Sequence, residues 1–134
     1  MSGSAQILVV DDEAAVRESL RRALALEGYE VELAADGAEA LYRLDTGAVH
    51  PDAIVLDVLM PGIDGLETCA RIKSDSATAD IPVLLLTGAD TPDLSERAKA
   101  VWASSVLRKP CPADQLRTAI LAATGNFSSI GQLH

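Results

Sequence analysis

Short apolar segments alternate with segments of helical periodicity along most of the chain. The apolar segments are too short for helices, and most of them end at Asp, Thr or Lys, as buried strands often do where they leave a sheet. The segments between them repeat apolar residues at helical spacing, with charged residues at the remaining positions. The sequence therefore predicts strands at 7–10, 29–34, 53–56, 82–86 and 105–107, and helices at 14–27, 38–44, 66–73, 94–101 and 113–123.

The order of these elements predicts the fold class. Strands without strict polar alternation, each followed by a helix, indicate a parallel sheet that is covered by helices on both faces. Right-handed crossovers and a length of 134 residues favour a single α/β domain with a doubly wound, five-stranded parallel sheet. We expect this domain to cover residues 1–124. Residues 125–134 are polar and rich in Ser and Gly, and we expect them to form a flexible C-terminal tail.

Polar residues interrupt the apolar pattern where four of the predicted strands end. Because parallel strands bring their carboxyl ends to one edge of the sheet, we expect these side chains to converge. Three clustered carboxylates repel one another, and a hard cation such as Mg²⁺, which suits carboxylates, water and a phosphoryl oxygen, relieves that repulsion. The converging residues are Asp11 and Asp12 after the first strand, Asp57 after the third, Thr87 after the fourth and Lys109 after the fifth.

Composition narrows the choice of partners. The formal net charge of −9 argues against direct binding of nucleic acid or anionic lipid. The apolar runs have strand length, and the first residues lack the features of a signal peptide, so we expect a cytoplasmic protein with no membrane contact. Cys69 and Cys111 do not form a disulfide framework and are expected to be reduced thiols.

Several short motifs together resemble the response-regulator receiver domains of two-component signalling, which include the chemotaxis regulators. The resemblance runs from residue 7 to residue 123, with the motifs in the family's order and each at the end of a predicted strand. It implies the flavodoxin-like (βα)5 fold with strand order 2-1-3-4-5, and a phosphorylation switch that catalyses only its own phosphorylation and dephosphorylation. The motifs are Val10-Asp11-Asp12-Glu13, Leu56-Asp57 with Met60-Pro61-Gly62 and Asp64-Gly65, Leu86-Thr87-Gly88, and Lys109-Pro110.

The resemblance also implies a role for each acidic residue. Asp57 would be the nucleophile that takes a phosphoryl group from a phosphohistidine on a sensor histidine kinase or a phosphotransfer protein. Asp12, Asp57 and the main-chain carbonyl of Leu59 would bind Mg²⁺ directly, while Asp11 would hold it through water.

The remaining family residues would bind the product. Lys109 would pair with Asp57 and later with the phosphoryl oxygens, and Thr87 would bond to the phosphoryl group. The peptide bond between Lys109 and Pro110 is expected to be cis. A downstream protein target would recognise the change of shape, and a homodimer through the fourth helix, the fifth strand and the fifth helix is a further expectation.

Simpler and competing interpretations remain open from the residues alone. Asp12 could cap the first helix, and Gly65 is expected to meet a backbone requirement where the third helix starts. An aspartyl-phosphate phosphatase would need a second acid two residues after Asp57, and that residue is Leu59. A flavodoxin-like binding module would need a Gly-rich or hydroxyl-rich first loop instead of an acidic one. A pseudo-receiver would usually have a broken acidic set.

Two positions depart from the commonest pattern of the family. Val106 stands three residues before Lys109, where an aromatic residue is common, and Trp102 stands seven residues before it, where Gly is common. The first departure concerns how a signal leaves the domain, because a ring that turns inward is the usual output mechanism. This departure does not affect the predicted phosphorylation site.

Overall fold

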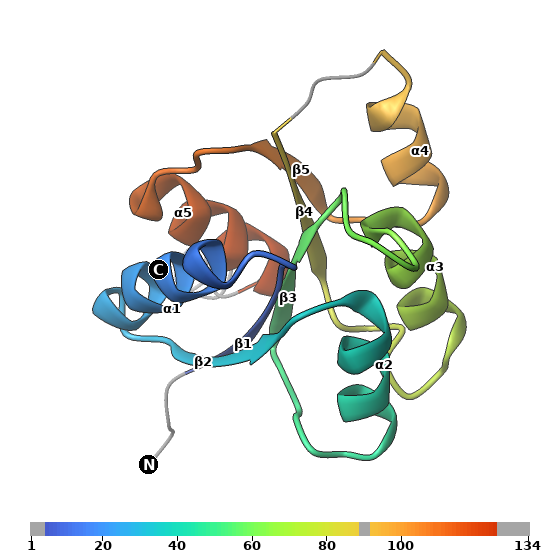
Figure 1. The fold of residues 1–134 in the computed structure, drawn as a ribbon, viewed down its shortest axis with the longest axis horizontal. Helices are drawn as coiled ribbons and strands as arrows, with labels where there is room; N and C mark the ends of the chain where they lie inside the picture. Colours follow the sequence, from blue (N-terminus) through green and yellow to red (C-terminus); the bar gives the residue numbers. More distant parts are fainter. Residues whose placement is uncertain (1–4, 89–91, 126–134) are drawn as a thin grey trace, which may run out of the picture.

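A computed structural model describes residues 5–88 and 92–125, and these form a five-stranded parallel sheet in the order β2-β1-β3-β4-β5 (Figure 1). Strands and helices alternate along the chain, as predicted, so the expected doubly wound α/β fold is confirmed. The strands are β1 (Gln6–Val10), β2 (Glu30–Ala34), β3 (Ala53–Asp57), β4 (Val83–Thr87) and β5 (Ser105–Arg108), and the helices are α1 (Ala14–Leu26), α2 (Gly37–Asp45), α3 (Gly65–Ser74), α4 (Leu94–Ala100) and α5 (Ala113–Thr124).

Predicted and observed bounds differ by one residue at most element ends and agree at the others. The differences that matter lie at strand ends, where Asp57 and Thr87 are the last residues of β3 and β4 and do not follow them. At β2 the strand begins at Glu30, and Tyr29 instead packs its side chain against the core on the α1 side of the sheet. Strand pairing extends to the last residue because the neighbouring strand offers backbone partners there, which an apolar pattern cannot show.

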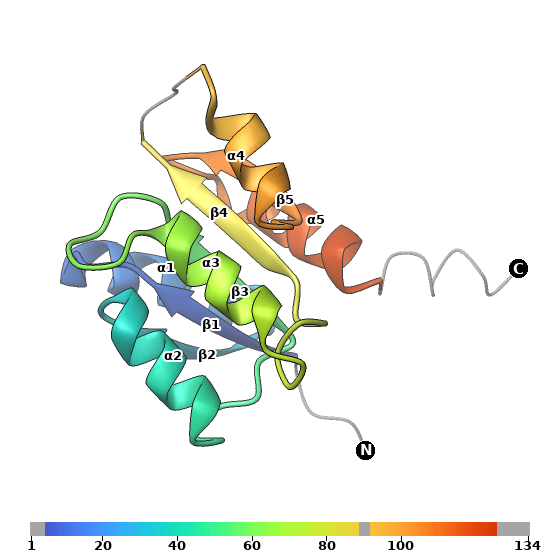
Figure 2. The same ribbon diagram turned by 90° about the vertical axis from the view of Figure 1, so that its right-hand side faces the viewer.

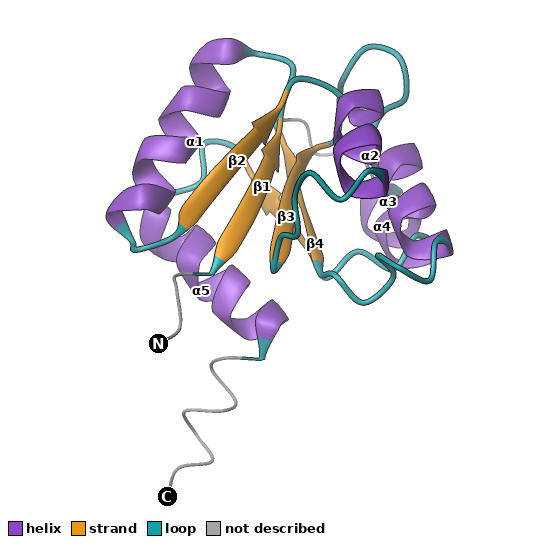
Figure 3. Ribbon diagram, turned by 90° about the horizontal axis from the view of Figure 1, so that it is seen from below, coloured by secondary structure: helices purple, strands orange, loops and turns teal. Residues whose placement is uncertain are grey.

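The sheet divides the core into two layers. Side chains of a strand alternate between its faces, so Leu8 and Val10 pack on one side of the sheet and Ile7 and Val9 pack on the other. Helices α1 and α5 cover one face, and α2, α3 and α4 cover the opposite face (Figures 2 and 3). Both faces of β3 and β4 are fully covered, which explains why their sequences are apolar without alternation.

Local signals in the sequence explain several helix ends. Asp36 and Asp64 cap α2 and α3, because each side chain accepts a hydrogen bond from the amide three residues later, at 2.8 Å. At the end of α1, Gly28 has a φ of 97°, its amide donates to Ala25, and the next amide donates to Leu24. This is a Schellman motif, and it confirms the predicted left-handed glycine after α1.

Trp102 occupies the same structural position after α4 that Gly28 occupies after α1. Its φ is 63°, its amide donates to the carbonyl of Lys99, and the amide of Ala103 donates to the carbonyl of Ala98. A left-handed conformation costs a residue with a Cβ atom about 1 kcal/mol, which explains why glycine is the usual choice at such a turn. The indole is 76% exposed, so burial offsets little of this cost.

Other sequence-based expectations meet the structure in part. Cys69 and Cys111 are both free thiols, as predicted, and burial raises the pKa of Cys69 to about 11. Over the described ranges, 5–88 and 92–125, none of the helices is long and apolar enough to cross a membrane. The predicted flexible tail lies outside the described residues, apart from Gly125 at its start.

Candidate functional site

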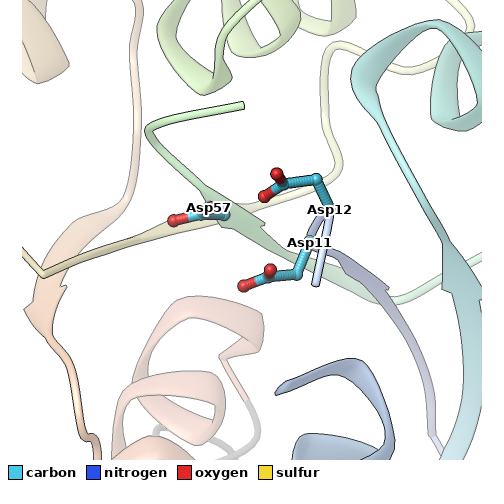
Figure 4. Close-up of side chains that lie close together, drawn as sticks. All are labelled: Asp11, Asp12 and Asp57. Carbon is cyan, nitrogen blue, oxygen red and sulfur yellow. The ribbon is translucent and has the colours of Figure 1, made fainter. Parts of the chain in front are cut away.

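The predicted polar residues come together at the carboxyl edge of the sheet. Asp11 and Asp12 follow β1, Asp57 ends β3, and β1 and β3 are neighbours at the point where the strand order reverses. One carboxylate oxygen from each of the three residues lies within 4.8 Å of the others. Figure 4 shows the three carboxylates side by side beyond the strand ends. The strand-end rule therefore placed these acids correctly.

Asp11 is the most completely bonded of the three acids. It is 1% exposed, and its Oδ1 accepts a hydrogen bond from the amide of Glu13 at 2.9 Å. Its Oδ2 accepts one from the ammonium of Lys109 at 2.8 Å. Both carboxylate oxygens thus have a protein donor, so Asp11 suits an indirect role toward a cation better than a direct one.

Asp12 differs from Asp11 in every one of these respects. It is exposed, and the part of the chain that the structure describes offers it no hydrogen bond or ion pair. It does not cap α1, since Glu13 is the N-cap residue and no side chain caps that helix. An unpartnered carboxylate beside two others is free to serve as a ligand.

Asp57 is buried at the end of β3, with an exposed fraction of 6%. Burial raises its pKa above the ordinary value, and the negative charges of Asp11 and Asp12 add to this effect, while Lys109 opposes it. A raised pKa means that the folded protein disfavours the ionised carboxylate. Asp57 therefore stabilises the metal-free fold increasingly as the pH falls through its folded pKa.

Lys109 supplies positive charge to the site from the far end of β5. Its Nζ lies 2.8 Å from Oδ2 of Asp11 and 3.1 Å from Oδ1 of Asp57, so the expected pairing with Asp57 is shared with Asp11. Burial lowers the pKa of Lys109, but the hydrogen bonds to Asp11 and Asp57 and the negative charges of these acids together outweigh burial and leave the pKa raised. The peptide bond between Lys109 and Pro110 is cis, as expected.

Thr87 and Leu59 flank the three acids. Thr87 is buried at the end of β4, one residue beyond Leu86, which is the partner of Asp57 in the sheet register. Its carbonyl accepts a hydrogen bond from the amide of Lys109 at 2.8 Å, which joins the ends of β4 and β5. Leu59 follows Asp57 by two residues and is 65% exposed. Its hydrocarbon side chain offers no ligand atom, so only its main-chain carbonyl could bind a cation.

Gly65 lies against the backbone of Asp57. A Cβ atom at this position would lie 2.2 Å from the carbonyl oxygen of Asp57 and 2.8 Å from Cα of Val58. The amide of Gly65 also donates to the carbonyl of Val58 at 2.8 Å. The structure confirms that the backbone at the start of α3 requires glycine at position 65, because a side chain there would overlap the main chain of Asp57.

The donor set fits a magnesium ion. Three carboxylates face one ammonium, so the ionised cluster carries more negative than positive charge. All three are hard oxygen donors, and one of them, Asp12, has no hydrogen-bond or ion-pair partner among the described residues. Mg²⁺ in proteins is usually bound by one or two carboxylates and keeps several waters. Asp12 and Asp57 could supply these carboxylates, while both carboxylate oxygens of Asp11 already accept hydrogen bonds from protein groups.

Comparison with known proteins identifies the family. A profile of the response regulator receiver domain matches residues 7–121. The chain belongs to the response regulator receiver domain family. Receiver domains of this family bind Mg²⁺ at an acidic aspartate cluster, and here Asp11, Asp12 and Asp57 form such a cluster.

Similar proteins agree with this assignment. The receiver domain is 49% identical over 115 residues to the response regulator MprA of Mycobacterium bovis, covering 84% of this chain and 47% of the relative. It thus spans about half the length of the curated relatives it matches. Among solved structures, chemotaxis protein CheY4 of Vibrio cholerae is 34% identical, with a TM-score of 0.83, covering 90% of this chain and 99% of CheY4. The receiver domain of a histidine kinase from Syntrophus aciditrophicus is 30% identical, with a TM-score of 0.81, covering 98% and 96% of the two chains.

Two features of this receiver domain's site were not predicted. The nearer partner of Lys109 is Asp11 and not Asp57, and Arg17 donates to the main-chain carbonyl of Asp11 at 2.8 Å. The sequence pattern did not single out Arg17, because a charged residue is ordinary on the polar face of an amphipathic helix. A test for arginines within two turns of a strand-end acid would have selected it.

Proposed function

We propose that this receiver domain is the phosphorylation switch of a two-component system, in which Asp57 accepts a phosphoryl group from a sensor histidine kinase or a phosphotransfer protein. The observation that carries the proposal is the position of Asp57, which lies within 4.8 Å of two further carboxylates and 3.1 Å from the Lys109 ammonium. Phosphoryl transfer requires positioning and neutralisation of charge on the equatorial oxygens, and this arrangement offers both. The switch would act in the cytoplasm.

The proposal assigns Mg²⁺ to the three acids. Asp12, Asp57 and the main-chain carbonyl of Leu59 would hold it directly, while Asp11, whose oxygens already have protein donors, would hold it through water. When bound, the ion neutralises negative charge on the phosphoryl oxygens. Asp57 supplies the attacking oxygen, Lys109 supplies a positive charge for the transferred group, and Thr87 supplies a hydroxyl donor from the end of β4.

An apolar hollow beside the acids supports a helical donor as the partner. The hollow has a volume of about 400 Å³ and lies next to the site. The helix α1 and the segment after β5 form its walls, and Lys109 is part of it. A partner helix seated there would bring its phosphohistidine toward Asp57. The lining residues include Val16, Leu20, Pro110 and Cys111.

The output surface is a further part of the proposal. Val106 lies half buried in β5 and packs against the core layer that also contains residues of α4. It has no ring to turn inward, so the change of shape would pass from Thr87 to α4 and on to a downstream protein target. A homodimer through α4, β5 and α5 is proposed as well, supported by a shallow hollow lined partly by Leu107, Ala119 and Ala122.

The direct test is chemical phosphorylation. Wild-type protein incubated with acetyl phosphate and Mg²⁺ is expected to gain the mass of one phosphoryl group, and the modification should be lost in mild base, as acyl phosphates are. Chelation of the metal should prevent the gain. A protein that is folded and binds Mg²⁺ but never gains mass would favour the pseudo-receiver alternative.

Binding of Mg²⁺ gives a second expected outcome. Mg²⁺ should raise the melting temperature in a concentration-dependent manner. At a hundredfold excess over its dissociation constant, the ion should add about 3 kcal/mol to the free energy of unfolding. Asp12→Ala should remove most of this shift, because it deletes the acid that no other group in residues 5–88 and 92–125 binds. Differential scanning fluorimetry over a Mg²⁺ series measures both, with Asp45→Ala as the control for a lost surface acid. A full shift in Asp12→Ala would place the metal elsewhere.

A further inference from the structure

The connection between β1 and α1 carries two of the three acids and consists of residues 11–13. A capping aspartate precedes each of α2 and α3 and fixes the entry of the chain, but the N-cap residue of α1, Glu13, makes no side-chain cap. The acid that could have capped α1, Asp12, has no hydrogen bond or ion pair within the part of the chain that the structure describes. The direction of this connection therefore depends on contacts other than a helix cap.

Arg17 makes such a contact. Its Nη1 donates a partly buried hydrogen bond to the main-chain carbonyl oxygen of Asp11 at 2.8 Å. The backbone of Arg17 belongs to the start of α1, since its amide donates to the carbonyl of Glu13 at 3.0 Å. The side chain therefore reaches back from the helix to the end of the strand and bridges the connection.

Asp11 is thereby held at all of its polar groups. Its amide donates to the carbonyl of Ala34 at 3.2 Å, and its carboxylate accepts from the Glu13 amide and from Lys109. The guanidinium of Arg17 binds the remaining carbonyl. Within residues 5–88 and 92–125, this guanidinium forms no ion pair with Asp11, Asp12 or Asp57. Its contact with the site runs through the main chain alone.

We propose that Arg17 is a positioning residue for the magnesium site, and that it acts by fixing the main chain that carries Asp11 and Asp12. With the Asp11 carbonyl bound, the Asp11 carboxylate stays with Lys109 and the Glu13 amide, and Asp12 remains directed at the cation. The inference rests on the proposed function, because it concerns the same site. It adds a residue that touches neither the phosphoryl group nor the ion.

Charge and positioning predict opposite effects when Arg17 is removed. A guanidinium near a cation site repels the cation, so loss of its charge alone would strengthen Mg²⁺ binding. Loss of a contact that orients the ligands would weaken Mg²⁺ binding, and residues that support ligands in this way typically contribute about tenfold or more to metal affinity. The sign of the change in affinity therefore separates the two roles.

The test compares Arg17→Met with Arg22→Met. Arg22 is an exposed arginine of the same helix, so its variant loses the same charge without losing the bridge. Calorimetric titration with Mg²⁺ is expected to show about tenfold weaker binding for Arg17→Met and no more than about a twofold change for Arg22→Met. Arg17→Lys, which keeps the charge but loses the planar fork, should fall between wild type and Arg17→Met.

A metal-free measurement tests the same idea independently of the ion. Hydrogen exchange of the Glu13 amide, which donates to Asp11, should become faster in Arg17→Met and stay unchanged in Arg22→Met. If Arg17→Met does not fold, the same two measurements on Arg17→Lys decide.

Wild-type Mg²⁺ affinity or tighter binding in the Arg17 variant, together with unchanged exchange of the Glu13 amide, would overturn the proposal. If wild type binds Mg²⁺ and takes a phosphoryl group in that case, the proposed function stands and only the role of Arg17 fails. A wild type that does neither refutes both.

Discussion

Asp57→Asn is expected to lose all phosphoryl incorporation from acetyl phosphate while keeping the fold. The amide has nearly the shape of the carboxylate but lacks an anionic oxygen that could attack phosphorus, and no second acid follows at the position of Leu59. Intact-protein mass spectrometry after incubation with Mg²⁺ measures the outcome. Asp80→Asn, which changes an exposed acid of the α3–β4 connection, is the matched control and should be labelled like wild type.

The same variant should also be more stable than wild type without metal. The raised pKa of Asp57 shows that the fold disfavours its ionised form, mainly because the carboxylate is buried. A neutral amide avoids that effect, so the melting temperature of metal-free Asp57→Asn should exceed that of wild type at neutral pH. Labelling that persists in Asp57→Asn would mean that another residue accepts the phosphoryl group.

Gly65→Ala is expected to cause the largest loss of stability among the substitutions considered. The added Cβ would lie 2.2 Å from the carbonyl oxygen of Asp57. This oxygen belongs to the backbone of the central strand, β3, and cannot move aside as the end of a flexible side chain can. We expect a loss of about 3 kcal/mol or more in unfolding free energy, which corresponds to a melting temperature lower by about 10 °C. Urea denaturation followed by circular dichroism measures the loss.

Gly88→Ala is the control for this substitution. A Cβ atom at Gly88 would meet no atom of the described residues within 4 Å, so the variant should unfold within about 0.5 kcal/mol of wild type. Because Gly65 touches the main chain of Asp57, any Gly65→Ala protein that does fold should also accept phosphate more slowly. Equal stability of the two alanine variants would show that α3 can shift away from β3 without loss.

The fold was predictable because the pattern of apolar residues within each short segment indicates which element that segment forms and how deeply it is buried. Runs such as 53–56 and 82–86 are apolar on both sides of the strand, which occurs where helices cover both faces of a parallel sheet. The positions of Asp11, Asp57 and Lys109 were predictable for the same reason, since the carboxyl ends of parallel strands share an edge. The family motifs then supplied the order of the strands.

The detailed bonding of the site was not predictable. Whether Lys109 lies nearer to Asp11 or to Asp57 depends on the course of the chain after β5, and the sequence pattern holds no information about that. The contact of Arg17 depends on how α1 leaves β1. The close approach of Gly65 to Asp57 depends on how α3 packs over the end of β3. All three depend on geometry between elements, whereas periodicity reports on each element alone.

The long separation between Lys109 and Asp11, 98 positions along the chain, has a consequence for protein synthesis. The acids of β1 and β3 precede Lys109 along the chain, and the ammonium can reach them only when β5 pairs with β4 at the edge of the sheet. A chain still emerging from the ribosome, or one with β5 detached, would hold three carboxylates without their counter-charge. Under the proposed function, such a chain would be a poor phosphoryl acceptor, because it would lack the positive charge that Lys109 offers to the transferred group.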